Sequence, residues 1–281
     1  MSNSLKRGAI GVFDSGYGGL TILKEIVELL PQYDYIYLGD NARAPYGTRS
    51  FETVYSYTAQ AVEHLFELGC PMVILACNTA SAKALRTIQQ NDLLEYDPSR
   101  RVLGVIRPTV EQLPNVSKNG HVGVFATRGT VASSSYPLEI AKLHGDQSFC
   151  VSQVACPMWV PLVENNEFSG KGAEYFVKKY VDQLFLLDPK IDTIILGCTH
   201  YPLLAPLIAK ELPEGVSLIS QGETVALSLA NYLERHTEMR DRITTGGTLR
   251  YLTTEQKDHF AKLAEIFMDS KVCAEHVEFH E

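Results

Sequence analysis

The sequence lacks a hydrophobic run long enough to cross a membrane, since no stretch of its 281 residues approaches the ~20 apolar residues that a bilayer requires. The N-terminal residues Met1–Arg7 are polar and lead directly into the strand-like run Ala9–Phe13, so we expect no signal peptide. These absences predict a cytoplasmic protein that has no membrane partner.

Excess positive charge is missing as well. The net charge is −8, which is unfavourable for the broad basic surface that nucleic-acid binding requires, so we expect no nucleic-acid partner. An anionic small molecule remains compatible with an acidic protein, because local N–H donors can hold a carboxylate. The six cysteines contain no C-x-x-C pair, and cytosolic cysteines stay reduced, so we expect no disulfide framework.

Nucleotide-binding motifs are absent too. The segment Gly16-x-Gly18 lacks the third glycine of a dinucleotide-binding fingerprint, because Thr21 occupies that position. The run Gly11–Gly16 is followed by Tyr17 instead of the lysine of a phosphate-binding P-loop. We therefore expect the glycines of this segment to let the backbone approach a ligand or pack against a sheet.

What is present is an alternation of short apolar runs with helix-period segments along the whole chain. The apolar runs predict strands at Ile10–Phe13, Tyr35–Leu38, Met72–Ala76, Val102–Ile106, Val122–Ala126, Val151–Ala155, Thr193–Leu196 and Val216–Ile219. One amphipathic stripe spans residues 20–30 before Pro31, and another spans residues 54–68 before Gly69. Apolar strands separated by helices indicate an α/β fold with mainly parallel sheets.

Two halves of the chain resemble each other. Ile10-Gly-Val-Phe13 matches Val122-Gly-Val-Phe125, and later in each half a strand ends in a cysteine, in Val73-Ile-Leu-Ala-Cys-Asn-Thr79 and in Ile194-Ile-Leu-Gly-Cys-Thr199. This similarity predicts two similar α/β domains that face each other across a ligand cleft, although α/β units can also look alike by coincidence.

Cys77 and Cys198 stand at the carboxyl ends of these strands, where open parallel sheets bind their ligands. Each precedes a predicted helix, at residues 80–90 and 203–212, and the N-terminus of a helix lowers the pKa of a nearby thiol. Inverting an amino acid requires removal of the α-proton from one face and return of a proton to the other, which suits two thiols on opposing walls. A cysteine is more often a small buried hydrophobic residue, and we interpret the others in that way: Cys70, Cys150, Cys156 and Cys273.

Six blocks of the sequence, in the same order and within residues 10–230, resemble the glutamate racemases of the aspartate/glutamate racemase family. They are Gly11-Val-Phe-Asp-Ser-Gly16, Asp40-Asn-Ala-Arg-Ala-Pro-Tyr-Gly47, Ala76-Cys-Asn-Thr-Ala-Ser81, Ala126-Thr-Arg-Gly-Thr130, Cys156-Pro157 with Val160-Pro-Leu-Val-Glu164, and Gly197-Cys-Thr-His-Tyr-Pro202. The resemblance implies a cofactor-independent isomerase that interconverts L- and D-glutamate by a 1,1-proton transfer and supplies D-glutamate for peptidoglycan synthesis in the cell wall. It also implies a homodimer and two pseudo-symmetric domains, residues 1–104 with 218–281 and residues 105–217, with the active site in the cleft between them.

The same resemblance assigns roles to individual residues. It makes Cys77 and Cys198 the acid–base pair, assisted by Asp14, Glu164 and His200, and it implies no metal ligand. It predicts substrate contacts from Asp14, Ser15, Tyr46, Gly47, Asn78, Thr79, Thr127, Thr199 and His200. A carboxylate beside a thiolate raises the thiol pKa instead of lowering it, so we assign Asp14 to orientation or proton relay near Cys77.

Three alternatives remain open on the sequence. Related aspartate racemases carry a similar pair of cysteine turns, but their second turn usually reads Cys-Thr-Glu, whereas this chain has Cys-Thr-His at 198–200, which favours glutamate. A non-catalytic protein whose two lobes close on an amino acid would share the fold without needing thiols. A metal or redox site would have to be built without the close ligand spacings of familiar zinc sites, from Cys77, Cys198, His200 and Asp14.

Overall fold

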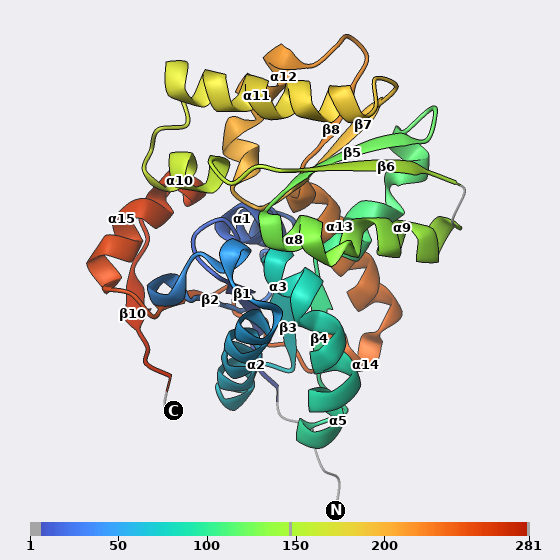
Figure 1. The fold of residues 1–281 in the computed structure, drawn as a ribbon. Helices are drawn as coiled ribbons and strands as arrows, with labels where there is room; N and C mark the ends of the chain where they lie inside the picture. The colour runs from blue at the N-terminus through green and yellow to red at the C-terminus, as the bar shows by residue number, and fades with distance from the viewer. Residues whose placement is uncertain (1–6, 146–147, 280–281) are drawn as a thin grey trace, which may run out of the picture.

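The computed structural model describes residues 7–145 and 148–279 and places their strands in two sheets, one above the other in Figure 1. The first sheet has the strand order β10-β9-β2-β1-β3-β4, and every neighbouring pair runs parallel. Its strands are β1 (Ile10–Asp14), β2 (Tyr35–Gly39), β3 (Met72–Leu75), β4 (Arg101–Gly104), β9 (Leu249–Thr253) and β10 (Ala274–His276).

The second sheet is smaller, with the strand order β6-β5-β7-β8, and it is also parallel throughout. Its strands are β5 (His121–Ala126), β6 (Cys150–Ala155), β7 (Thr193–Gly197) and β8 (Ser217–Ile219). The predicted α/β fold with two mainly parallel sheets is therefore confirmed. All eight predicted strands are present, with ends that shift by at most a few residues.

Helices connect successive strands and cover the sheets, with α11 and α12 above the second sheet and α2 beside the first (Figure 1). The α-helices are α1 (Leu20–Leu29), α2 (Phe51–Glu67), α3 (Asn78–Lys83), α4 (Leu85–Thr87), α5 (Leu93–Tyr96), α6 (Ile106–Glu111), α7 (Leu113–Val116), α8 (Arg128–Ser133), α9 (Ser135–His144), α10 (Trp159–Glu164), α11 (Lys171–Leu187), α12 (Ala205–Glu211), α13 (Gln221–Arg235), α14 (Thr237–Arg240) and α15 (Lys257–Met268). Short 3-10 helices are η1 (Asn41–Arg43), η2 (Tyr46–Thr48) and η4 (Tyr201–Leu204), and η3 (Ile88–Asp92) is a π-helix.

Local sequence signals account for the limits of the first two long helices. The helix α1 ends at Leu29, shortly before Pro31, which cannot continue a helix. The helix α2 begins after Ser50, whose hydroxyl accepts a hydrogen bond from the Thr53 N–H at 3.1 Å. It ends just before Gly69, which has the positive φ of 92° that terminates many helices. Both predicted amphipathic stripes are thus confirmed.

Two predicted helices and two strands differ from expectation. The predicted helix at 80–90 is broken, since α3 ends at Lys83 and a π-helical turn follows α4. The predicted helix at 203–212 starts as a 3-10 turn at Tyr201 and becomes α-helical only at Ala205. The sequence analysis missed β9 and β10, because β9 carries the exposed Arg250 within its run and β10 reads Ala-Glu-His, without an apolar core.

After the second sheet the chain returns to the first. The strand β8 spans the predicted boundary between residues 217 and 218, α13 then packs against α1, and β9 and β10 complete the first sheet. The order in which the chain visits the two sheets follows the predicted path, while the domain limits themselves stay a prediction.

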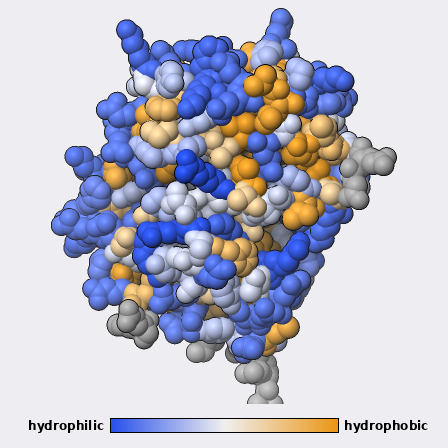
Figure 2. All heavy atoms as spheres, in the orientation of Figure 1, coloured by the Kyte–Doolittle hydropathy of each residue, from blue (hydrophilic) through white to orange (hydrophobic). Residues whose placement is uncertain are grey.

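The surface is mixed in character. Figure 2 shows hydrophilic residues over most of the visible face, with hydrophobic residues gathered mainly in its upper half, around the second sheet. Among residues 7–145 and 148–279, no helix combines the length and apolar character needed to cross a bilayer.

Candidate active site

The two predicted thiols lie at matching positions of the two sheets. Cys77 follows β3 after a single residue, and Cys198 follows β7 directly. Each side chain is only 6% exposed. The charge of Cys198 contributes to the pKa of Cys77, so the two sulfurs are near enough to interact. The prediction that strand ends from separate halves of the chain bring these cysteines to one place agrees with this arrangement.

The surroundings of Cys77 favour the protonated thiol. Its Sγ lies 3.3 Å from the Ser15 hydroxyl and accepts a hydrogen bond from the Ala80 N–H at 3.4 Å. Burial, followed by the negative charge of Asp14, nevertheless raises the pKa of Cys77 to about 12. The expectation that a helix N-terminus would lower this pKa is therefore wrong for Cys77, because α3 is a helix of only 6 residues and the loss of solvation outweighs its dipole.

Cys198 has a different neighbour, an imidazole that is itself held by a carboxylate. Its Sγ lies 3.8 Å from His200 Nδ1, and His200 Nε2 lies 3.0 Å from Glu164 Oε1. Burial alone would lower the pKa of His200, but the hydrogen bonds and negative charges of Cys198 and Glu164 raise it to about 10. Because α12 begins only at Ala205, the imidazole, and not the N-terminus of an α-helix, is the positive group beside Cys198.

Asp14 ends β1 and is completely buried. Its Oδ2 accepts a hydrogen bond from the Gly16 N–H at 3.0 Å, while Oδ1 makes no hydrogen bond of ordinary geometry to any described residue. Burial raises the pKa of Asp14, and the charge of His200 and the backbone N–H groups of Gly19 and Gly16 lower it only in part. A carboxyl group in this setting can hold or pass on a proton close to Cys77.

The loop after β1 packs directly against the loop that carries Cys198. The Thr21 hydroxyl donates a hydrogen bond to the Thr199 carbonyl at 3.0 Å. A Cβ at Gly18 would lie 2.4 Å from His200 Nδ1 and 2.4 Å from Thr199 Oγ1, which real atoms do not tolerate. The absence of a side chain at Gly18 therefore permits the close approach of His200, whereas the sequence led us to expect a ligand or a sheet against this segment.

The other predicted substrate residues form a second contact between the halves of the chain. Thr79 Oγ1 lies 3.0 Å from Thr127 Oγ1, and a Cβ at Gly47 would lie 2.9 Å from the Thr127 side chain. The Tyr46 hydroxyl donates a hydrogen bond to Asp40 Oδ2, so this phenol is already engaged within the protein. Thr79 and Thr127 thus face each other across the boundary at which the two cysteines meet.

Asn78 is predicted to contact the substrate, but its side chain serves a buried network. Its Oδ1 accepts a hydrogen bond from the Tyr136 hydroxyl at 2.8 Å, and its Nδ2 donates to Gln221 Oε1 at 2.6 Å. Gln221 Nε2 in turn donates to the Tyr136 hydroxyl and to Thr109 Oγ1, both at 3.0 Å. These partners were not identified from the sequence, because α9, α6 and α13 meet only in the folded chain. The sequence around Gln221, Ser220-Gln-Gly-Glu223, offered no signal that could have found them.

The four remaining cysteines divide into two pairs. Cys70 and Cys156 are fully buried, as predicted, but Cys150 and Cys273 are exposed, so the interpretation of these two as packing residues is wrong. Cys150 begins β6 and Cys273 directly precedes β10, and both are edge strands of their sheets.

Neither the hollows nor the metal-ligand geometry points to the two thiols. A hollow of about 820 Å³, lined by residues such as Asp40 and Arg43, contains neither of them. A cavity of about 680 Å³ between the halves of the chain is lined by residues such as Arg86, Arg107 and Lys142, and contains neither Cys77 nor Cys198. Among the described residues, one group of metal-ligating side chains converges, and Cys77, Cys198, His200 and Asp14 do not belong to it. Acid–base chemistry therefore fits the two thiols better than a zinc site.

The chain is similar over nearly its whole length to known proteins. It matches the Asp/Glu/hydantoin racemase family over residues 10–228. It is 41% identical over 278 residues to a glutamate racemase of Ruegeria sp. (strain TM1040), covering 95% of this chain and 99% of that protein. A glutamate racemase of Persephonella marina is 38% identical over 96% of this chain and 97% of its own length. The crystal structure of glutamate racemase from Francisella tularensis in complex with D-glutamate matches the fold with a TM-score of 0.84 and 34% identity, covering 98% of each chain.

Proposed function

The chain belongs to the Asp/Glu/hydantoin racemase family, and from that premise we propose that it interconverts L- and D-glutamate and supplies D-glutamate for peptidoglycan synthesis. The protein is accordingly an isomerase, an amino-acid racemase, as the resemblance of its motifs predicted. The observation that supports the proposal most directly is that Cys77 and Cys198 follow strands of different sheets and lie near enough for their charges to interact. A cytoplasmic location and a homodimer are part of the same proposal.

The two thiols carry out the proton transfer from opposite faces of the substrate. In the resting form, the positive His200 imidazole stabilises negative charge on the Cys198 sulfur, while the raised pKa keeps Cys77 protonated. The Cys198 thiolate takes the α-proton of one enantiomer and leaves the electron pair on the α-carbon. The Cys77 thiol then donates its proton to the opposite face, so that Cys198 ends as the thiol and Cys77 as the thiolate.

The auxiliary residues act through the thiols. Glu164 holds His200 in the orientation that directs Nδ1 towards Cys198. Ser15 and the Ala80 N–H stabilise the Cys77 thiolate that forms during turnover, and the buried Asp14 passes protons beside it. Backbone and hydroxyl donors hold the carboxylates of glutamate, and the residues assigned to this task are Ser15, Tyr46, Gly47, Asn78, Thr79, Thr127, Thr199 and His200.

Glutamate reaches the thiols only when the two halves of the chain separate. Both sulfurs belong to side chains that are 6% exposed, and the hydroxyl pair Thr79–Thr127 spans the boundary. Single hydrogen bonds of this type contribute about 1 kcal/mol each, and the Thr21–Thr199 and Tyr136–Asn78 hydrogen bonds join the same two halves. The aspartate alternative remains an outcome of the assay below.

A chirality assay on protein freed of pyridoxal phosphate and metal tests the proposed activity. We expect L- and D-glutamate each to approach the racemic mixture, aspartate to react far more slowly, and turnover in D₂O to place deuterium on the α-carbon. Equal turnover of aspartate would indicate the aspartate racemases instead, and the absence of turnover with every amino acid would contradict the proposal. Binding of glutamate without turnover would support the amino-acid-binding alternative.

Replacement of Gly18 by alanine tests the contact between the loop after β1 and the loop that carries Cys198. The added Cβ pushes His200 and Thr199 away, so we expect an overpacking cost of about 1–3 kcal/mol and, from displacement of the site, a kcat lower by about 100-fold. Gly172→Ala is the matched control, because a Cβ at this helical position in α11 meets nothing within 4 Å. The unfolding temperature and kcat are measured for both variants. A fully active Gly18→Ala enzyme would contradict the close approach of Gly18 to His200.

A further inference from the structure

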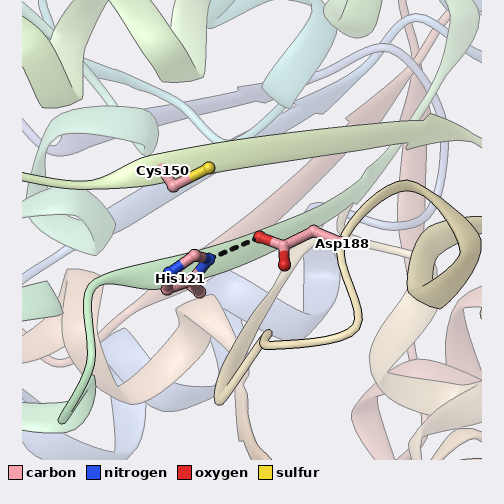
Figure 3. A group of neighbouring side chains, drawn as sticks. All are labelled: His121, Cys150 and Asp188. Carbon is pink, nitrogen blue, oxygen red and sulfur yellow. Dashed lines mark hydrogen bonds and ion pairs between the residues drawn. The ribbon is translucent and has the colours of Figure 1, made fainter.

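Three side chains with metal-ligating groups converge where strands of the second sheet begin, at the end of the sheet opposite to the one that carries Cys198. His121 begins β5 and Cys150 begins β6, and the two residues are paired in the parallel register. Asp188 follows the last residue of α11. Figure 3 shows His121 and Asp188 facing each other, with Cys150 on the neighbouring strand.

The carboxylate is the centre of this group. His121 Nδ1 lies 2.7 Å from Asp188 Oδ2, and the Lys190 N–H donates to Asp188 Oδ1 at 2.9 Å. The Cys150 Sγ lies within 4.8 Å of the ligand atoms of both His121 and Asp188. The carboxylate therefore has both an imidazole and a thiol beside it.

This order of contacts does not suit a nucleophilic triad. In such triads the imidazole lies between the nucleophile and the carboxylate, so that it can take the proton of the nucleophile. Here the one interaction drawn among the three side chains in Figure 3 joins His121 to Asp188 and not to Cys150, and a negative neighbour makes a thiol less acidic. The nitrogen of His121, the oxygen of Asp188 and the sulfur of Cys150 are better placed to bind one cation together.

We propose that His121, Cys150 and Asp188 bind a divalent transition-metal ion of the zinc type. One imidazole nitrogen, one thiolate and one carboxylate oxygen form a ligand set that zinc accepts, with water in the fourth tetrahedral position. The thiolate and the carboxylate together neutralise the two positive charges of the ion. The ligand atoms already lie within 4.8 Å of one another.

Binding needs only a small rearrangement. Tetrahedral coordination at the usual bond lengths places ligand atoms about 3.3–3.6 Å apart. His121 Nδ1 and Asp188 Oδ2, now 2.7 Å apart, therefore have to separate slightly, while Cys150 Sγ has to approach them by about an ångström at most. The exposed Cys150 side chain is free to turn towards the other two. The thiol loses its proton to solvent, and the proton of His121 Nδ1 moves to Nε2, so that Nδ1 presents its lone pair to the ion.

The site is structural and not catalytic. The strand β5 runs from His121 to Ala126, and a rise of ~3.3 Å per residue puts its first residue about 20 Å from Thr127 in the active site. The bound ion ties together the starts of β5 and β6 and the connection from α11 to β7. We therefore expect the metal to raise the unfolding temperature and to leave kcat unchanged.

Titration of the metal-free enzyme with Co²⁺, the spectroscopic substitute for zinc, tests the site. We expect the near-ultraviolet charge-transfer band of a cobalt–thiolate bond with one ion per chain, and an increase in unfolding temperature on addition of Zn²⁺. Cys150→Ser should lose the band and the increase, and His121→Gln should weaken binding at least about tenfold. Cys273→Ser, which alters the other exposed cysteine, is the matched control and should keep both signals.

Two results would overturn the proposal. One is the absence of a thiolate band in the unaltered enzyme. The other is a band of full strength in Cys150→Ser, which would show that Cys77, Cys198 or another thiol holds the ion. Racemase activity of Cys150→Ser is measured in parallel, and wild-type turnover in that variant confirms that it is folded.

Discussion

Replacement of Cys77 or of Cys198 by alanine should lower kcat for racemisation by about two to four orders of magnitude in both directions, the usual contribution of a positioned general acid or base. Each thiol performs one half of the inversion, because each serves one face of the α-carbon. Polarimetry or coupled assays with both enantiomers of glutamate provide the measurement. Cys70→Ala, a change of a buried cysteine in the core of the first sheet, is the matched control.

Solvent exchange separates the two thiols more sharply than the overall rate. A variant with one remaining thiol can still remove the α-proton from the face that this thiol sees, and then return a deuteron to the same face. In D₂O, therefore, Cys77→Ala should label one enantiomer without inverting it, and Cys198→Ala should label the other. Labelling of the same enantiomer by both variants, or nearly full racemisation in either of them, would contradict the assignment of the thiols to opposite faces.

His200→Asn should produce the second large effect, and this effect depends on direction. The variant loses the positive charge beside Cys198, so proton transfer at Cys198 slows by about 100-fold, within the range for acid–base groups. The two enantiomers of glutamate have equal free energies in water, so kcat/KM must fall equally in both directions. The asymmetry appears in kcat, with a compensating change in KM. Because the pKa of His200 is raised to about 10, the imidazole is protonated below that pH, and the difference from wild type should fade as pH rises through it.

Primary isotope effects identify which thiol His200 serves. In His200→Asn the step at Cys198 limits the rate, so the α-deuterated enantiomer whose deuteron faces Cys198 should show a larger isotope effect than in wild type. The opposite enantiomer, whose deuteron is removed by Cys77, should show a smaller one. Glu164→Gln should change both values in the same sense but less, since Glu164 touches only the far side of the imidazole. Equal changes for both enantiomers would assign His200 to neither cysteine individually.

The sequence by itself determined the architecture and the places of Cys77 and Cys198 at the ends of strands. Continuous apolar runs before these cysteines predicted buried parallel strands, and parallel strands end at one edge of their sheet, which is where open parallel sheets bind ligands. Pro31 and Gly69 ended their helices as expected, because their backbone restrictions act locally. The six motif blocks identified the family, because each block is a short continuous segment of the chain and can be recognised in the sequence alone.

Only the tertiary structure decided the electrostatics and the contacts between distant segments. The helix dipole that follows Cys77 is visible in the sequence, but burial is a property of the whole molecule and reverses its effect on the thiol pKa. Gln221 meets Asn78 across 143 positions of sequence, and Cys150 meets Asp188 through the arrangement of β6 and α11. Such neighbours depend on how helices and sheets pack, and neither propensity nor periodicity, both of which are local, carries that information.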